Sequence, residues 1–293
     1  MRHLPIPTDH AGQPYAAGAV FNTCIVNEAH DFHVRLTGIV PNVVAAETLY
    51  DQQAQTTTLH TFQRQPTIVG ANGAVTTDEL KYLYTYRMVG DEQPGRAIYD
   101  RLRAAGGEKC PLCGVNAVKT LDHHLPKSKY PVLSVAPTNL IPSCRDCQSA
   151  KKSVFPTTAE EETLHPYFDN VDGDIWLTAV VNQETPATFT FGVTPPAAWG
   201  QLLIDRVLNH MESFELYSLF AGNAANELTG IRQGLTDLFN SGGTAAVQAH
   251  LQNQAASWRQ GGQQAGRLNS WQLAMYQAAA NDNWFYSQGF ALV

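Results

Sequence analysis

Two pairs of cysteines share the spacing Cys-x-x-Cys in this chain of 293 residues, and 30 residues separate the pairs. The first pair is Cys110 and Cys113, the second is Cys144 and Cys147, and Cys24 stands alone. Pairs at this spacing form tight knuckles whose four thiolates close a tetrahedron around Zn²⁺. Four sulfur ligands leave no open position for a substrate. The sequence therefore predicts a structural zinc site, which can contribute on the order of 10 kcal/mol to folding.

The segment between the pairs carries side chains suited to phosphodiester hydrolysis. It contains Leu121-Asp122-His123-His124-Leu125-Pro126-Lys127 and, further on, Asn139-Leu140. The reaction needs a base that activates water and a cation that stabilises charge on the phosphate. An imidazole such as His123, with an ordinary pKa of about 6.5, can accept the proton at neutral pH. We expect Asp122 to bind Mg²⁺ or Mn²⁺ and the Asn139 amide to orient the second nitrogen of His123.

Residues 108–155 resemble the HNH, or ββα-metal, endonuclease family. The resemblance rests on Asp122-His123, on Asn139-Leu140, and on the second cysteine pair followed by a polar residue and Lys151. It implies a module of two strands and a helix that cuts DNA with the help of a divalent cation. It also implies that His123 is the general base, because the family places a proline three residues after that histidine, here Pro126.

One position departs from the family pattern. Gln148 stands where family members usually carry a histidine or asparagine that binds the catalytic cation. Glutamine still offers an amide oxygen, and His165 and His124 are alternative ligands. If the site does not cleave, the segment is a zinc-stabilised module that binds nucleic acid or protein.

Residues 100–155 are the basic part of an acidic chain. They contain nine Lys or Arg and four Asp or Glu, a net charge of +5, whereas the whole chain carries −7 and the remainder therefore −12. A local positive excess favours a polyanion, with an affinity that falls as salt rises. We expect these side chains to bind DNA phosphates: Lys127, Lys129, Arg145, Lys151 and Lys152.

The acidic remainder is a poor surface for DNA, which indicates a partner protein. The chain looks like HNH proteins of prokaryotic anti-phage defence and restriction systems. Some of these, such as the nuclease subunit of Septu-type systems, act beside an ABC-like or SMC-like ATPase. The chain has no Gly-x-x-x-x-Gly-Lys loop of its own to hold ATP phosphates. We expect an ATPase partner. A further hypothesis is that the whole chain is an interaction subunit, in which the acidic helical body matters more than the zinc segment.

The rest of the sequence predicts a mainly helical fold with a short β-hairpin. Residues 76–88 begin with a helix cap, a second helix starts near Pro94, and residues 37–49 fit either helix or strand. Residues 175–181 and 188–193 predict the hairpin strands. After Pro196 the apolar spacing predicts helices, with breaks at Gly242-Gly243 and Gly261-Gly262 and a helix pair across 245–266.

These signals divide the chain into three parts. Residues 1–107 form an N-terminal region with helical support, 108–156 the HNH module, and 157–293 a strand pair followed by a helical domain. No run approaches the roughly 18 apolar residues of a membrane span, and the N-terminus lacks the apolar stretch of a secretory signal. Cysteines at metal-binding spacing favour a reducing compartment. We therefore expect a cytoplasmic protein that binds no membrane.

Overall fold

A computed structural model describes residues 2–265 and 267–292 and divides the chain into two compact units, His3–Asp169 and Asn170–Val293, the latter together with Arg2. Helices make up 53% of the structure, and the strands form small antiparallel pairs. The prediction of a mainly helical fold is therefore confirmed. The boundaries predicted after residues 107 and 156 both lie inside the first unit.

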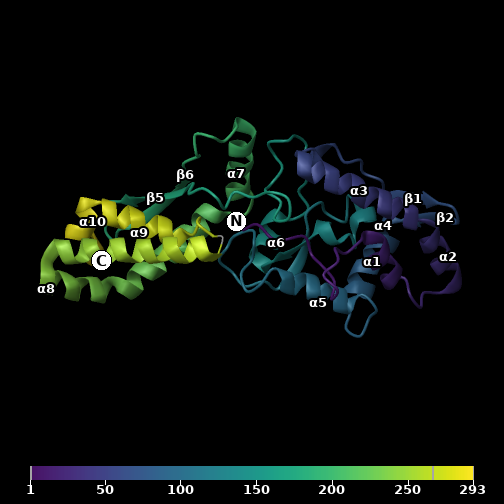
Figure 1. The fold of residues 1–293 in the computed structure, drawn as a ribbon, viewed down its shortest axis with the longest axis horizontal. Helices are drawn as coiled ribbons and strands as arrows, with labels where there is room; N and C mark the ends of the chain where they lie inside the picture. The colour runs from purple at the N-terminus through teal and green to yellow at the C-terminus, as the bar shows by residue number, and fades with distance from the viewer. Residues whose placement is uncertain (1, 266, 293) are drawn as a thin grey trace. The chain divides into compact units, whose positions relative to one another are not determined.

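The first unit consists of helices and short strands, of which the longer helices and the first strand pair are labelled in Figure 1. In chain order they are α1 (Ala17–Cys24), α2 (His30–Gly38), α3 (Val40–Thr56), the 3-10 helix η1 (Leu59–Thr61), β1 (Thr67–Gly70), β2 (Gly73–Thr76), α4 (Thr77–Tyr82), the π-helical turn η2 (Leu83–Met88), α5 (Arg96–Ala105), β3 (Thr120–His123), the 3-10 helices η3 (Pro131–Leu133) and η4 (Pro137–Asn139), β4 (Leu140–Ser143) and α6 (Arg145–Lys151). Residues 37–49 therefore belong to α2 and α3.

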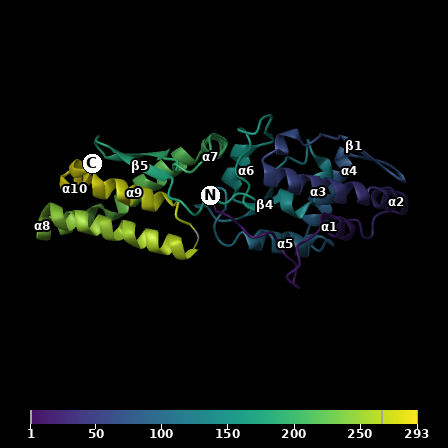
Figure 2. The same ribbon diagram turned by 45° about the horizontal axis from the view of Figure 1, so that its top comes forward.

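Helices α1 and α3 lie side by side and form much of the core of this unit (Figure 2). Phe21 of α1 and Tyr50 of α3 are fully buried there. Leu121 of β3 and Leu140 of β4 belong to the same hydrophobic core. The strand pair inside the predicted HNH module is thus anchored on the preceding helices rather than on a core of its own.

The predicted helix at residues 76–88 begins with a capping box. The backbone N–H of Thr76 donates to Glu79 Oε2 at 2.8 Å, and the N–H of Glu79 donates to Thr76 Oγ1 at 3.3 Å. From Leu83 the helix continues as the π-helical turn η2 to Met88. The buried side of this helix carries Tyr84, whose hydroxyl donates to the Leu121 carbonyl of β3 at 3.0 Å.

Strands β3 and β4 pair in antiparallel fashion, and α6 follows β4 directly. In this register Asp122 lies opposite Ile141 and His123 opposite Leu140. Helix α5 packs against both strands. The chain between the cysteine pairs therefore folds as strand, strand and helix.

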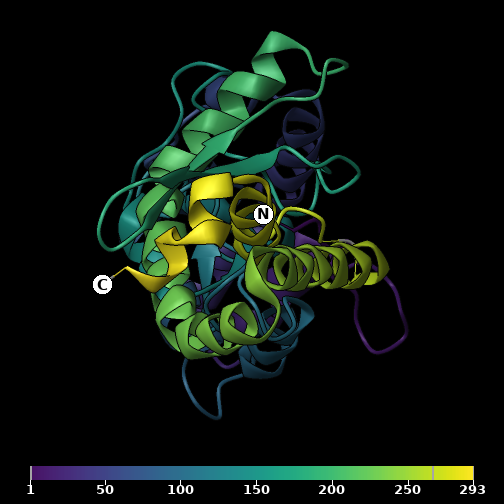
Figure 3. The same ribbon diagram turned by 90° about the vertical axis from the view of Figure 1, so that its left-hand side faces the viewer.

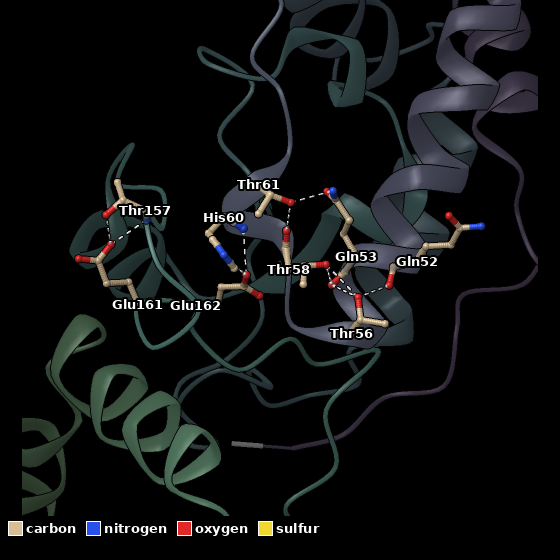
Figure 4. A network of polar contacts seen from close by, with 9 residues as sticks. All are labelled: Gln52, Gln53, Thr56, Thr58, His60, Thr61, Thr157, Glu161 and Glu162. Carbon is tan, nitrogen blue, oxygen red and sulfur yellow. Dashed lines mark hydrogen bonds and ion pairs between the residues drawn. The ribbon is translucent and has the colours of Figure 1, made fainter.

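The chain after α6 returns to η1, which follows α3, through the polar contacts drawn in Figure 4. Glu162, which is 1% exposed, accepts a hydrogen bond from the His60 backbone N–H at 2.9 Å and contacts His60 Nδ1 at 2.7 Å. Glu161 accepts two bonds from Thr157, each of 2.7 Å. These contacts fix the segment that leads to His165.

The second unit consists of one hairpin and a set of helices. They are β5 (Leu177–Asn182), β6 (Thr188–Val193), α7 (Gln201–Ser213), α8 (Leu216–Ala265), α9 (Trp271–Asn281), α10 (Asn283–Ser287) and the 3-10 helix η5 (Gly289–Ala291). Helix α9 packs against both α8 and β5 (Figure 3). The predicted hairpin is confirmed within two residues at each end. Within residues 2–265 and 267–292, no helix combines the length and apolar character that a membrane span requires.

The predicted glycine breaks differ in outcome. At Gly243, with φ of 66°, the backbone leaves the helical conformation and α8 is kinked. Gly261 and Gly262 do not end the helix, so the predicted helix pair is wrong. At Gly262 an added Cβ would lie 2.7 Å from the Arg267 carbonyl oxygen. This glycine therefore allows a close approach of the following chain instead of breaking the helix.

Candidate active site and metal centre

The four paired cysteines form one buried cluster. Their sulfur atoms all lie within 4.8 Å of one another, and Cys113 Sγ and Cys144 Sγ are 4.0 Å apart. A tetrahedron with Zn–S bonds of about 2.3 Å has edges of about 3.8 Å. The cluster could therefore hold a metal ion such as zinc. Among the described residues it is the one group of three or more His, Cys, Asp or Glu side chains gathered in this way.

Backbone N–H groups point at two of these sulfurs. The N–H of Val115 donates to Cys113 Sγ at 3.5 Å, and the N–H of Cys147 donates to Cys144 Sγ at 3.4 Å. Cys144 is also the N-cap of α6. By contrast, burial raises the pKa of the lone Cys24 thiol to about 12, as expected for a packed thiol. The cluster thus ties the start of α6 to the first cysteine pair.

His123 lies at the end of β3 and is 5% exposed. Its Nε2 is 2.8 Å from the main-chain carbonyl oxygen of Ser134. Because a carbonyl only accepts, Nε2 must carry the proton, and Nδ1 must carry the lone pair. Nδ1 has no hydrogen-bond partner among the described residues. The tautomer therefore leaves a proton acceptor open on this ring.

Helix α4 and the turn η2 hold both sides of this arrangement. The Tyr84 ring meets the His123 ring edge to face, with centroids 4.4 Å apart and planes at 70°. The Ser134 hydroxyl donates to the carbonyl of Leu80, four residues before Tyr84, at 3.0 Å. One helix face thus positions both the His123 ring and the Ser134 carbonyl, which accepts the hydrogen bond from that ring.

The surroundings of His123 favour its neutral form. Burial lowers its pKa from the usual 6.5 to about 3, and the nearby charges of Lys127 and Lys151 act in the same direction. At pH 7 the ring is therefore neutral and able to accept a proton, while the same burial and charges oppose the imidazolium that forms.

Asn139 does not orient His123, so the predicted contact is wrong. Its Oδ1 accepts from the Leu125 N–H at 2.7 Å, and its Nδ2 donates to the Leu125 and Leu133 carbonyls at 3.1 and 3.2 Å. The side chain is fully buried and spans the loop between β3 and β4. Asn139 holds the shape of the loop. The role predicted for Asn139, which is to orient the His123 ring, belongs to the Ser134 carbonyl.

Replacing Asn139 by alanine is expected to destabilise the protein by about 3 kcal/mol. The change leaves buried polar groups of Leu125 and Leu133 without partners and opens a cavity. Asn72→Ala is a matched control, because Asn72 is exposed and makes one bond, to the Val34 carbonyl at 3.0 Å. Urea unfolding of both metal-loaded variants measures the difference. Equal midpoints would contradict the structural role of Asn139.

Asp122 is paired with Lys151. Lys151 Nζ lies 3.1 Å from Asp122 Oδ2, and it also donates to the main-chain carbonyl of His123. The two side chains are 7% and 10% exposed. Lys151 is therefore not the free phosphate ligand that the sequence predicts, because its charge is engaged inside the protein.

The other predicted basic residues remain accessible. Lys129, Arg145 and Lys152 are exposed. Lys127 is half-buried, with its Nζ 4.6 Å from the centroid of the Tyr84 ring, and burial lowers its pKa.

Gln148, the predicted cation ligand, is half-buried on α6, three residues before Lys151. A helix places residues at this spacing on one face.

His165 and His124 contact each other, and His165 also contacts Tyr50 of α3. His165 Nε2 is 2.8 Å from the Tyr50 hydroxyl, and its Nδ1 accepts from the Tyr167 N–H at 3.2 Å. Both ring nitrogens are therefore already engaged, which makes His165 unsuitable as a cation ligand. The His124 ring packs on the His165 ring with centroids 4.3 Å apart. This cluster fixes the returning chain to α3.

The comparisons with known proteins identify one relative of the chain. Protein ea31 of Escherichia phage lambda is 32% identical over 262 residues, which span 84% of this chain and 87% of the phage protein. The chain belongs to the ea31 family. No protein-family model and no solved structure matches the ea31-like chain. Since the match covers more of the chain than either compact unit contains, membership of the ea31 family involves both units.

Proposed function

We propose that the chain is an HNH-type endonuclease that hydrolyses phosphodiester bonds in DNA, with His123 as the general base. The observation that carries the proposal is the fixed tautomer of His123. Its Nε2–H is bound to the Ser134 carbonyl at 2.8 Å, and no described residue engages its Nδ1 lone pair. The strand, strand and helix around it and the adjoining cysteine cluster match what the resemblance implies.

The reaction follows from these atoms. Nδ1 takes a proton from water as the water oxygen attacks phosphorus, and the bond to the leaving 3′ oxygen breaks. The ring needs no rearrangement, because Ser134 and Tyr84 already hold it. Lys127, whose Nζ lies 4.6 Å from the Tyr84 ring centroid, supplies a positive charge for the phosphate.

The oxygens near Asp122 fit a hard divalent cation. Support comes from the Asp122 carboxylate and the His123 carbonyl, which both accept hydrogen bonds from the Lys151 ammonium. Mg²⁺ or Mn²⁺ bound at Asp122 would stabilise charge that develops on the phosphate. The structural metal proposed for the cysteine cluster is Zn²⁺.

A DNA strand would contact the exposed side chains of Lys129, Arg145 and Lys152. We further propose a partner ATPase and a role in prokaryotic anti-phage defence or restriction, in the cytoplasm, on the ground of the resemblance and of the acidic remainder of the chain. The Asp122–Lys151 ion pair favours a second candidate, a zinc-stabilised module that binds without cutting, because the lysine ammonium already neutralises the carboxylate.

Nicking of supercoiled plasmid by the purified, zinc-loaded chain separates these candidates. We expect nicked and then linear DNA in Mg²⁺ or Mn²⁺ at low salt, with a rate that falls as salt rises. DNA retention without nicking in either ion would favour the binding module. Co-purification with an ATPase from the native host tests the partner.

A further inference from the structure

The oxygens around the Lys151 ammonium form a defined cation site. Nζ of Lys151 donates to Asp122 Oδ2 at 3.1 Å and to the His123 carbonyl. With only 7% of the lysine side chain exposed, the ammonium depends on these acceptors rather than on water. Carboxylate and carbonyl oxygens are also the ligands that Mg²⁺ and Mn²⁺ take in proteins.

Strand pairing directs the His123 carbonyl toward this site. The N–H of His124 donates to the Asn139 carbonyl, so the ladder bonds of β3 fall on His124 and Asp122. His123, which lies between them, consequently points its carbonyl away from β4. The Leu121 carbonyl, two residues earlier, points the same way and accepts from Tyr84.

Lys151 is placed so that it can leave without unfolding its helix. It is the last residue of α6, and Lys152 follows with a left-handed φ of 55°. A lysine side chain has four rotatable methylene groups and a mobile point charge. Rotation of this side chain alone would free the two oxygens.

We propose that Asp122 Oδ2 and the His123 carbonyl form one cation site, which the Lys151 ammonium and a divalent cation occupy in turn. This inference rests on the proposed function and deepens it with a main-chain ligand and a competing side chain. A DNA phosphate that attracts Lys151 favours entry of the divalent cation. By linkage, the divalent cation favours binding of the phosphate to the same extent.

Calorimetric titration of Mn²⁺ into the zinc-loaded full chain tests the exchange without any cleavage. We expect Lys151→Met to bind one Mn²⁺ at least tenfold more tightly than wild type, because the competing ammonium is gone. Asp122→Asn is expected to bind Mn²⁺ at least tenfold more weakly than wild type. Equal or weaker Mn²⁺ binding by Lys151→Met would overturn the proposal.

Wild-type protein allows a second measurement, which is needed if the loss of the buried charge pair prevents Lys151→Met from folding. Acetylation by an N-hydroxysuccinimide ester, followed by mass spectrometry, reports the accessibility of each lysine. We expect excess Mn²⁺ to raise the labelling rate of Lys151 at least tenfold and to leave the exposed Lys129 unchanged. An unchanged rate at Lys151 would overturn the exchange.

Failure of the exchange can be distinguished from failure of the proposed function. If the wild-type chain nicks DNA and Lys151→Met binds Mn²⁺ no more tightly, hydrolysis stands and the exchange does not. If Lys151→Met binds Mn²⁺ more tightly and the chain cuts no DNA, the cation site stands and the nuclease does not.

Discussion

Replacing Cys144 by serine is expected to abolish metal binding at the cysteine cluster and to lower the stability of the first unit by several kcal/mol. Four thiolate ligands can contribute on the order of 10 kcal/mol, and three ligands retain only part of this. The elements that the cluster joins are short, with four residues in each of β3 and β4 and seven in α6. Such elements depend on long-range constraints for their stability.

Serine at this position isolates the effect of the metal. Cys144 is the N-cap of α6, and its Sγ accepts a bond from the Cys147 N–H at 3.4 Å. A serine hydroxyl is itself a favoured N-cap and can accept this bond. The loss observed in Cys144→Ser therefore reports the missing metal ligand rather than a missing cap.

Elemental analysis and thermal unfolding measure the outcome. We expect one zinc per chain in wild type, none in Cys144→Ser, and one in the control Cys24→Ser. Cys24 is equally buried but lies outside the cluster, so its replacement tests the effect of a buried hydroxyl alone. Full zinc content in Cys144→Ser would contradict the metal centre.

The parts of the fold and of the site that the sequence predicts are those that depend on local residue spacing. The cysteine pairs, the capping box at Thr76 and the β5–β6 hairpin each depend on residues close together in the chain. The carbonyl that accepts the hydrogen bond from His123 belongs to Ser134, 11 residues later in the chain. The aromatic contact comes from Tyr84, 39 residues earlier. A main-chain carbonyl has no signature in a single sequence, and an aromatic residue at helical spacing resembles any core residue.

Two charged or polar residues were predicted to be important for the wrong reason. Asn139 does serve the loop that carries His123, but through Leu125 and Leu133 rather than through the imidazole. Lys151 does lie at the site, but as a buried partner of Asp122. Residue type identifies a candidate, whereas burial and hydrogen-bond partners, which depend on the whole fold, decide its role.

Replacing His123 by alanine is expected to reduce the rate of plasmid nicking by about 10³-fold, within the range that a general base contributes. The zinc content should not change, because His123 is not part of the cysteine cluster. His30→Ala is the matched control, since His30 is exposed at the start of α2. Nicking by His123→Ala at the wild-type rate would eliminate His123 as the base.

The pH dependence provides an independent check on the environment of His123. Its pKa is lowered from 6.5 to about 3 by burial, so the folded protein keeps the ring neutral where the unfolded chain protonates it. Stability due to the neutral ring is therefore complete above pH 6.5 and is lost progressively as the pH falls toward 3. At a pH one unit below the unfolded value, the loss is about 1.4 kcal/mol.

Urea unfolding of wild type and His123→Ala at pH 7.5 and pH 5.5 measures this difference. We expect the stability advantage of wild type to shrink by about 1.4 kcal/mol between the two pH values, because alanine does not titrate. The nicking rate of wild type should show no protonation step near pH 6.5 over the same range. A change in the nicking rate near pH 6.5 would mean that the His123 ring is hydrated and protonated like a free histidine. The fixed tautomer on which the proposed function rests would then be wrong.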